Sequence, residues 1–201
     1  MTKNVIFDIG AVLIDWNPSY LYSKMLPDKT AIAEFFEEVD FAGWNRGLDA
    51  GGRWGDAVLE LSGRFPHRRE LIEAAHLRWH EMLPGAIDGT VAILEQLADK
   101  ETPLYAITNY SSEKWVETCR RFPFFRHFRD IVVSGDERLL KPDPAIYHIC
   151  LERNGLNAQD CIFIDDSPKN VEGANAIGIH GIHFETPEKL ADDLAELGFL
   201  P

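Results

Sequence analysis

The sequence predicts an α/β fold: a Rossmann-like parallel sheet flanked by helices, with an α-helical segment inserted into it. Three observations support this class. Short apolar runs of strand length recur along the chain, and each ends in a polar residue. Segments of helical periodicity separate them, and alternating elements of this kind form parallel sheets with helices on both faces. One helix-rich stretch interrupts the alternation after the first run.

The elements of the alternating part follow from apolar spacing. The first run, for example, is Val5-Ile-Phe-Asp-Ile9, and the first helix of this part places Val91, Leu94 and Leu97 on one face. The predicted strands are 5–9, 104–108, 131–134, 161–165 and 181–184, and the predicted helices are 89–100, 113–121, 145–154, 170–177 and 187–197.

The interrupting stretch, residues 16–83, resembles an inserted cap. It carries every tryptophan except Trp115. Its predicted helices are 30–39, 54–62 and 67–82. The dipeptides Asn17-Pro18 and Pro84-Gly85 punctuate regular structure and would serve as hinges. We therefore expect an α/β core made of residues 1–15 and 84–201, with a helical cap of residues 16–83 between its two parts.

Composition narrows the possible partners. The 33 acidic residues exceed the 20 basic ones and give a formal charge of −13, which repels nucleic acid and anionic membrane surfaces. No apolar run reaches 18 residues. The three cysteines lie in predicted helices or strands and resemble small buried apolar residues. We expect a cytoplasmic protein that binds neither nucleic acid nor membrane.

Polar residues that end the predicted strands are the first candidates for a site, because ligands of parallel sheets bind at the carboxyl ends of the strands. Asp8, Thr108, Ser134 and Asp165 occupy such positions. Asp8 follows Val-Ile-Phe, where a carboxylate is costly unless it has a cation or donors as partners. An isolated aspartate there could equally cap the next turn.

Asp165-Asp166 gives a stronger signal. Two adjacent acids close the apolar run Cys-Ile-Phe-Ile, and a divalent ion would relieve their mutual repulsion. Mg²⁺ is the expected ion, and the alternative to a metal site is a solvated turn.

Phosphate-binding groups are available nearby. Thr108-Asn109 offers a hydroxyl and amides, although the pair is also a helix-cap signal. Lys141 precedes Pro142-Asp143-Pro144, so a rigid turn holds its backbone. A lysine fixed near several strand ends could offset the charge of a phosphoryl group and of a nucleophile.

Together these segments resemble the haloacid dehalogenase (HAD) superfamily of hydrolases, specifically its phosphatase-like branch with a small helical cap. The resemblance covers the core almost end to end. The segments that carry it, in order, are Phe7-Asp8-Ile-Gly-Ala-Val-Leu-Ile-Asp15, Ile107-Thr108-Asn109, Leu140-Lys141-Pro142-Asp143-Pro144 and Phe163-Ile-Asp165-Asp166-Ser167-Pro168-Lys169-Asn170-Val-Glu-Gly-Ala174.

The resemblance implies a Mg²⁺-dependent phosphatase acting on a small organic phosphate, with Asp8 attacking phosphorus to form an aspartyl-phosphate. Asp8, the carbonyl oxygen of Gly10 and Asp166 would hold Mg²⁺, supported by Asp165. Phosphoryl oxygens would bind Thr108, the Asn109 amide and Lys141, and Lys141 would also keep Asp8 ionised and positioned.

One departure from the family pattern concerns proton transfer. Most phosphatases of the superfamily carry a second aspartate two residues after the nucleophile, as general acid and base, and here that position is Gly10. Asp15 is a possible replacement, with a structural or cap-closing role equally open. We therefore expect a slow enzyme or one that prefers good leaving groups, such as sugar 1-phosphates.

Two other functions stay open. The first is a 2-haloacid dehalogenase, in which Asp8 attacks carbon without a metal, although such enzymes usually lack the adjacent acids at 165 and 166. The second is a catalytically silent module that binds phosphate or Mg²⁺ without turnover.

Substrate choice in capped members depends largely on the cap, where residues 44–53 are the best candidate segment. Trp44, Asn45, Arg46 and Asp49 supply aromatic, amide and charged groups among flexible glycines. A solvated loop between cap helices is the alternative interpretation.

Overall fold

The computed structural model describes residues 4–200 and contains a five-stranded parallel sheet with the order β3-β2-β1-β4-β5. The chain moves outward from β1 in one direction and then restarts beside it with β4. A crevice therefore opens where the strand order reverses, at the carboxyl ends of β1 and β4. The strands are β1 (Asn4–Phe7), β2 (Leu104–Thr108), β3 (Asp130–Val133), β4 (Cys161–Asp165) and β5 (His180–His183).

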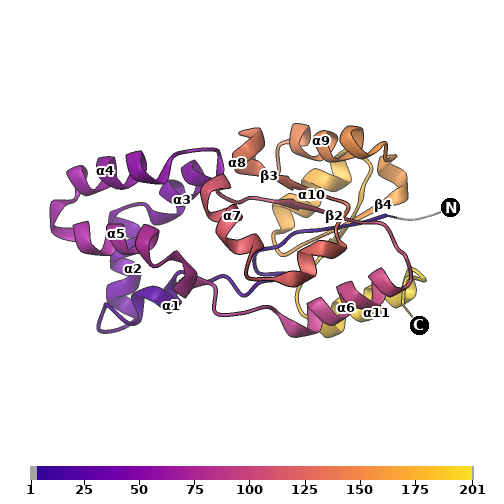
Figure 1. The fold of residues 1–201 in the computed structure, drawn as a ribbon, viewed down its shortest axis with the longest axis horizontal. Helices are drawn as coiled ribbons and strands as arrows, with labels where there is room; N and C mark the ends of the chain where they lie inside the picture. Colours follow the sequence, from indigo (N-terminus) through magenta and orange to yellow (C-terminus); the bar gives the residue numbers. More distant parts are fainter. Residues whose placement is uncertain (1–3, 201) are drawn as a thin grey trace.

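Helices cover both faces of the sheet, as the sequence predicted (Figure 1). Alternate residues of β1 show the two faces: Val5 and Phe7 belong to one apolar cluster and Ile6 to the other. Helices α6 and α11 pack on the first face, and α9 and α10 pack on the second. The core helices are α6 (Asp88–Asp99), α7 (Ser112–Cys119), η3 (Pro123–His127), α8 (Ser134–Glu137), α9 (Pro144–Asn154), η4 (Ala158–Asp160), α10 (Pro168–Ala176) and α11 (Pro187–Glu196).

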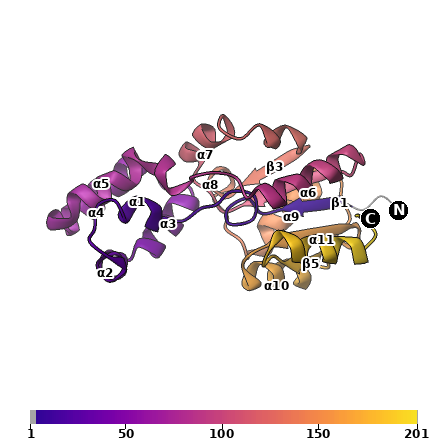
Figure 2. The same cartoon turned by 90° about the horizontal axis from the view of Figure 1, so that it is seen from below.

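The stretch between β1 and α6 is helical and lies beside the carboxyl end of the sheet (Figures 1 and 2). The two segments that connect it to the sheet run antiparallel and are hydrogen-bonded to each other: the backbone N–H of Asp15 donates to the Gly85 carbonyl, and that of Asn17 donates to the Met82 carbonyl. We propose the division predicted above, and call residues 16–83 the helical insertion. Its helices are α1 (Ser19–Tyr22), α2 (Lys29–Glu38), α3 (Phe41–Asp49), α4 (Trp54–Arg64), η1 (Pro66–Arg68), α5 (Arg69–Leu77) and η2 (Trp79–Met82).

The insertion differs from its sequence prediction in two places. Residues 67–82 were expected to form one helix but form three short ones, with Arg78 departing from helical geometry at φ −120° and ψ 25°. Residues 44–49, which lay outside the predicted helices, belong to α3. The Asp40 side chain caps α3 by accepting from the backbone N–H of Gly43, and Phe41 and Leu48 are buried on one helical face.

Candidate active site

Three charged side chains from distant parts of the sequence meet at the carboxyl edge of the sheet. Nζ of Lys141 lies 2.7 Å from Oδ1 of Asp8 and 2.7 Å from Oδ2 of Asp165, and it also donates to the Ile107 carbonyl at 2.9 Å. These partners match the three N–H groups of an ammonium. All three charged side chains are buried. Lys141 thus has its donors occupied by protein, and it holds Asp8 in place.

Asp165 has a supporting position. It is fully buried, and Oδ1 accepts hydrogen bonds from the backbone N–H of Ser167 and from Nδ2 of Asn170, at 2.8 and 2.9 Å. Oδ2 accepts from Lys141. Because these protein donors already contact both oxygens, Asp165 orients Lys141 and the start of α10. Asn170 was quoted in the sequence motif without a role, and the structure places it between Asp165 and the cavity described below.

Burial dominates the electrostatics of this cluster. It raises the pKa of Asp8 to about 7, because the effects of burial, Asp165 and Asp166 exceed the opposing effect of Lys141. Burial alone would lower the pKa of Lys141, but the neighbouring carboxylates of Asp165 and Asp8 outweigh it and raise that pKa. The ammonium form of Lys141 is therefore favoured, and further positive charge nearby would favour the ionised form of Asp8.

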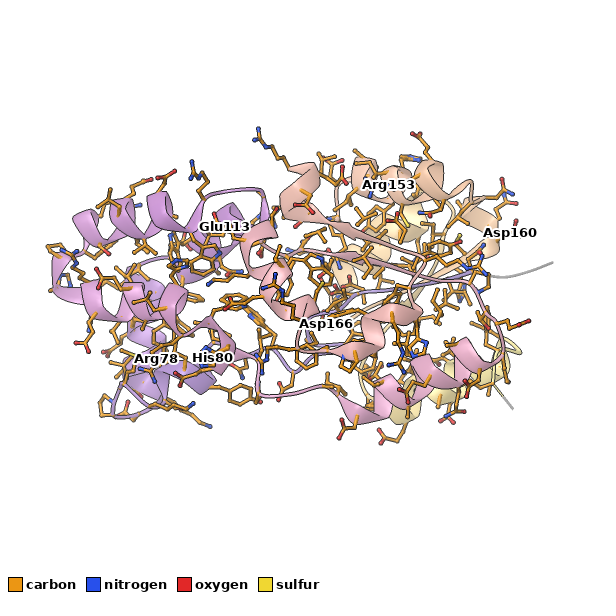
Figure 3. All side chains as sticks on the ribbon, viewed as in Figure 1. Arg78, His80, Glu113, Arg153, Asp160 and Asp166 are labelled. Atoms are coloured by element: carbon orange, nitrogen blue, oxygen red, sulfur yellow. The ribbon has the colours of Figure 1, made fainter. Side chains whose placement is uncertain are left out.

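Oxygen ligands that could hold such a positive charge, as a metal ion, are present. Asp8, Asp165 and Asp166 each offer a carboxylate oxygen within 4.8 Å of the others. Burial, followed by the charge of Asp165, raises the pKa of Asp166. Three carboxylates facing one ammonium leave an excess of negative charge, and oxygen ligands suit Mg²⁺. The residues therefore fit a divalent cation. Figure 3 shows Asp166 between the insertion and the sheet.

Thr108 and Asn109 lie where the sequence placed them, at the end of β2 and on the wall of the same cavity. The Asn109 side chain is committed to the Lys141 backbone: Oδ1 accepts from the Lys141 N–H at 2.8 Å, and Nδ2 donates to its carbonyl at 3.1 Å. This reciprocal pair ties the loop before α9 to the end of β2. The Asn109 side chain therefore positions Lys141.

A cavity of about 230 Å³ opens over these groups. Small-molecule sites begin at roughly 300 Å³, so its size favours a small ligand. The sheet side contributes Asp8, Gly10, Ala11, Thr108, Asn109, Tyr110, Asp166 and Asn170, and the insertion contributes Trp16, Asn45, Asp49 and Trp79.

The four predicted specificity residues separate into two pairs. Asn45 and Asp49 line the cavity. Trp44 instead packs against Phe41 and Trp54 and donates through Nε1 to the Ala57 carbonyl, and Arg46 is exposed. Helical spacing explains the separation, because residues four apart share a face of α3 whereas adjacent residues do not. Trp16 and Trp79 also line the cavity.

Asp15 is not among the residues that line this cavity. Its Oδ2 accepts a hydrogen bond from the Tyr20 hydroxyl at 2.9 Å, and its backbone pairs with Gly85. This environment agrees with the structural alternative for Asp15, at the junction between the insertion and the sheet.

Among residues 4–200, no helix has both the length and the apolar character needed to cross a membrane.

Comparison with known sequences identifies several relatives. The chain is 35% identical over 115 residues to flavin mononucleotide hydrolase 1 of Arabidopsis thaliana, covering 56% of this chain and 45% of that protein. It is 40% identical over 214 residues to mouse acyl-CoA dehydrogenase family member 10, covering 98% of this chain but only 19% of that protein. A phosphorylated carbohydrates phosphatase of Thermotoga maritima is 26% identical over 184 residues, which cover 89% of this chain and 83% of the relative. The chain thus spans less than half the length of the first two relatives.

Solved structures share the fold. A HAD family enzyme of Bacteroides thetaiotaomicron superposes with a TM-score of 0.76 at 22% identity, over 96% of this chain and 98% of that one. The same enzyme in complex with magnesium and inorganic phosphate gives a TM-score of 0.72 at 21% identity, over 92% of this chain and 96% of that one. The family model for haloacid dehalogenase-like hydrolases matches residues 55–184, more than half of the sequence. This chain therefore belongs to the haloacid dehalogenase-like hydrolase family.

Proposed function

We propose that this protein is a Mg²⁺-dependent phosphatase that hydrolyses a small organic phosphate through an aspartyl-phosphate on Asp8. The buried cluster of Asp8, Lys141 and Asp165 is the observation that carries the proposal, because it fixes a carboxylate at the base of a small cavity. Relatives named as phosphatases and a structural neighbour crystallised with magnesium and phosphate support it.

Asp8 would act as the nucleophile. Its carboxylate would form a bond to phosphorus while the ester P–O bond breaks, and water would then hydrolyse the acyl phosphate. Lys141 keeps the carboxylate oriented through the 2.7 Å contact and adds positive charge beneath the reacting group. The Thr108 hydroxyl and the backbone N–H of Asn109 would donate to the phosphoryl oxygens.

Asp8, Asp166 and the Gly10 carbonyl would hold Mg²⁺, and Asp165 would support the site through Lys141 and Asn170. When bound, the ion would offset the charge of the phosphoryl oxygens and favour the ionised form of Asp8.

The proposal is tested by measuring phosphate release from sugar, nucleotide and small-acid phosphates, and halide release from 2-haloacids, with Mg²⁺ and with chelator. We expect phosphate release that the chelator abolishes. Chelator-insensitive halide release would instead identify a dehalogenase. Mg²⁺ binding detected by calorimetry without either product would identify a silent binding module.

Asp8→Asn should abolish turnover and leave the fold intact, because the amide is a far weaker nucleophile than the carboxylate. Circular dichroism and urea denaturation would confirm that the variant is folded. A variant that kept near-normal phosphate release would remove Asp8 from this role.

A further inference from the structure

The segment that follows Asp8 offers the cavity of the proposed phosphatase no second acid. Gly10 occupies the position two residues after Asp8, and a Cβ built there would meet nothing within 4 Å. The other acid of this segment, Asp15, accepts from the Tyr20 hydroxyl away from the cavity lining. An alkoxide is a poor leaving group unless it is protonated, so efficient turnover favours an acid elsewhere in the cavity.

Asp49 lines the same cavity from the insertion. It is the last residue of α3 and lines the cavity together with Asp8 and Gly10. Its backbone is attached to the sheet side: the Ser134 hydroxyl donates to the Asp49 carbonyl at 2.6 Å and accepts from the backbone N–H of Tyr110 at 2.8 Å. These two hydrogen bonds therefore hold the end of α3 against the carboxyl ends of the strands.

The side-chain amide of Asn45 can form a hydrogen bond with Asp49 in either protonation state of the acid. One turn earlier on α3, its Nδ2 donates to Oδ2 of Asp49 at 2.9 Å, which suits the carboxylate. Its Oδ1 is buried and has no hydrogen-bond partner in the described part of the chain. Rotation of the amide would turn Oδ1 toward a protonated Asp49, which could then donate to it. A group that gives up a proton and takes one back needs such a partner.

The environment of Asp49 favours its protonated form at neutral pH. Burial raises the pKa of Asp49 to about 8, a hydrogen bond from the Ser111 backbone opposes this, and the charge of Asp8 adds to it. The position at the carboxyl end of a helix also disfavours a negative charge.

We propose that Asp49 is the general acid and base of this enzyme, taking from the insertion the role that Gly10 cannot fill. This inference rests on the proposed phosphatase function. As Asp8 bonds to phosphorus and the ester P–O bond breaks, the Asp49 proton passes to the leaving oxygen. The Asp49 carboxylate then takes a proton from water as the water oxygen bonds to phosphorus and the bond to Asp8 breaks, which restores the starting state.

The first test compares two leaving groups of nearly equal size, phenolate and 4-nitrophenolate. Nitrophenolate leaves without protonation, so Asp49→Asn should change kcat/KM for 4-nitrophenyl phosphate little. For phenyl phosphate, kcat/KM should fall by about 10²- to 10⁴-fold, the usual contribution of general acid catalysis. Asp56→Asn is the matched control, because this exposed acid lies elsewhere on the insertion. It should behave like the unaltered protein with both esters.

The second test follows the basic step. With 4-nitrophenyl phosphate, the Asp49→Asn protein should release about one equivalent of nitrophenolate per active site in a burst. Later turnovers should be slow, because hydrolysis of the acyl phosphate lacks its base. Acid quenching followed by mass spectrometry should show the phosphoryl group accumulating on Asp8.

The third test restores an acid on the other wall. Gly10→Asp in the Asp49→Asn background should recover activity toward phenyl phosphate, because the space beside Gly10 is open. Recovery would also show that the doubly substituted protein folds.

Equal losses with both esters, or no change with phenyl phosphate, would overturn the role of Asp49 while leaving the phosphatase function standing. Unaltered protein that released phosphate from neither ester would contradict the phosphatase function, and the role of Asp49 with it.

Discussion

The two walls of the cavity are built from different materials. On the sheet side, charges lie buried in contact, with Lys141 between Asp8 and Asp165. On the insertion side, Trp79 lines the cavity and packs on Trp54, which in turn contacts Trp44 behind the wall, at centroid distances of 5.3 and 5.4 Å. The sheet wall therefore carries a cluster of buried charges in contact, whereas the insertion wall combines packed aromatic rings with an acid, Asp49.

The same difference governs how each wall tolerates change. Removing one member of a buried charge cluster leaves an uncompensated charge, which is costly both to stability and to chemistry. Removing a buried ring leaves a cavity, which costs stability without altering the charges at the strand ends. Substitutions on the two walls can therefore test whether the walls act independently.

The largest effect is expected for Lys141→Met. Two buried carboxylates would lose their shared ammonium, so the free energy of unfolding should fall by about 3–5 kcal/mol. Phosphate release should disappear because Asp8 loses its orientation. Urea denaturation and a phosphate assay measure the two effects. Lys29→Met, at an exposed lysine of α2, is the control and should stay within about 0.5 kcal/mol of the parent. A Lys141→Met protein with ordinary turnover would refute the assigned role.

Trp54→Ala should affect stability more than chemistry. The Trp54 side chain is fully buried, and its Nε1–H donates to the Ser111 hydroxyl at 2.9 Å across the boundary between the walls. We expect a loss of about 3–5 kcal/mol from the cavity it leaves. Leu59→Ala, on the same helix at 73% exposure, should change the unfolding free energy little. A loss below about 1 kcal/mol for Trp54→Ala would indicate that the insertion can repack.

A smaller effect concerns the pH dependence of stability. The folded-state pKa of Asp49, about 8, lies above the ordinary value of 3.8, so the folded protein retains a proton that the unfolded chain releases. The stabilising contribution of Asp49 is fully present below pH 3.8 and is lost as pH rises through 8. Asp49→Asn should remove this slope from denaturation curves measured between pH 4 and 8. Parallel stability profiles for the two proteins would contradict the raised pKa.

The sheet wall could be predicted closely from the sequence. The ends of the strands that carry Thr108 and Asp165 follow from local apolar runs that stop at polar residues. Asp8 follows β1 directly, although that strand ends at Phe7, two residues before the predicted end. Lys141 was a candidate because a rigid turn follows it, but its contact with Asp8 spans more than 100 residues of sequence and could not follow from local pattern.

The insertion wall was predicted less well for physical reasons. The glycines of residues 44–53 left a solvated loop open as the alternative, yet the apolar face formed by Phe41 and Leu48 packs among aromatic residues and stabilises α3. Tertiary burial outweighed local propensity there. Only the helical geometry reveals that Asn45 and Asp49 share the face that lines the cavity.

The hydrogen bond from Ser134 to the Asp49 carbonyl has a consequence for the order of events in a catalytic cycle. Ser134 belongs to the sheet wall and Asp49 to the insertion wall, so this bond exists only while the two walls are together. Under the role proposed for Asp49, proton transfer would take place only in that closed arrangement. Parting of the walls would let an alcohol depart and would carry the base away with it. The acyl phosphate would then wait, shielded from hydrolysis, until the helix returned.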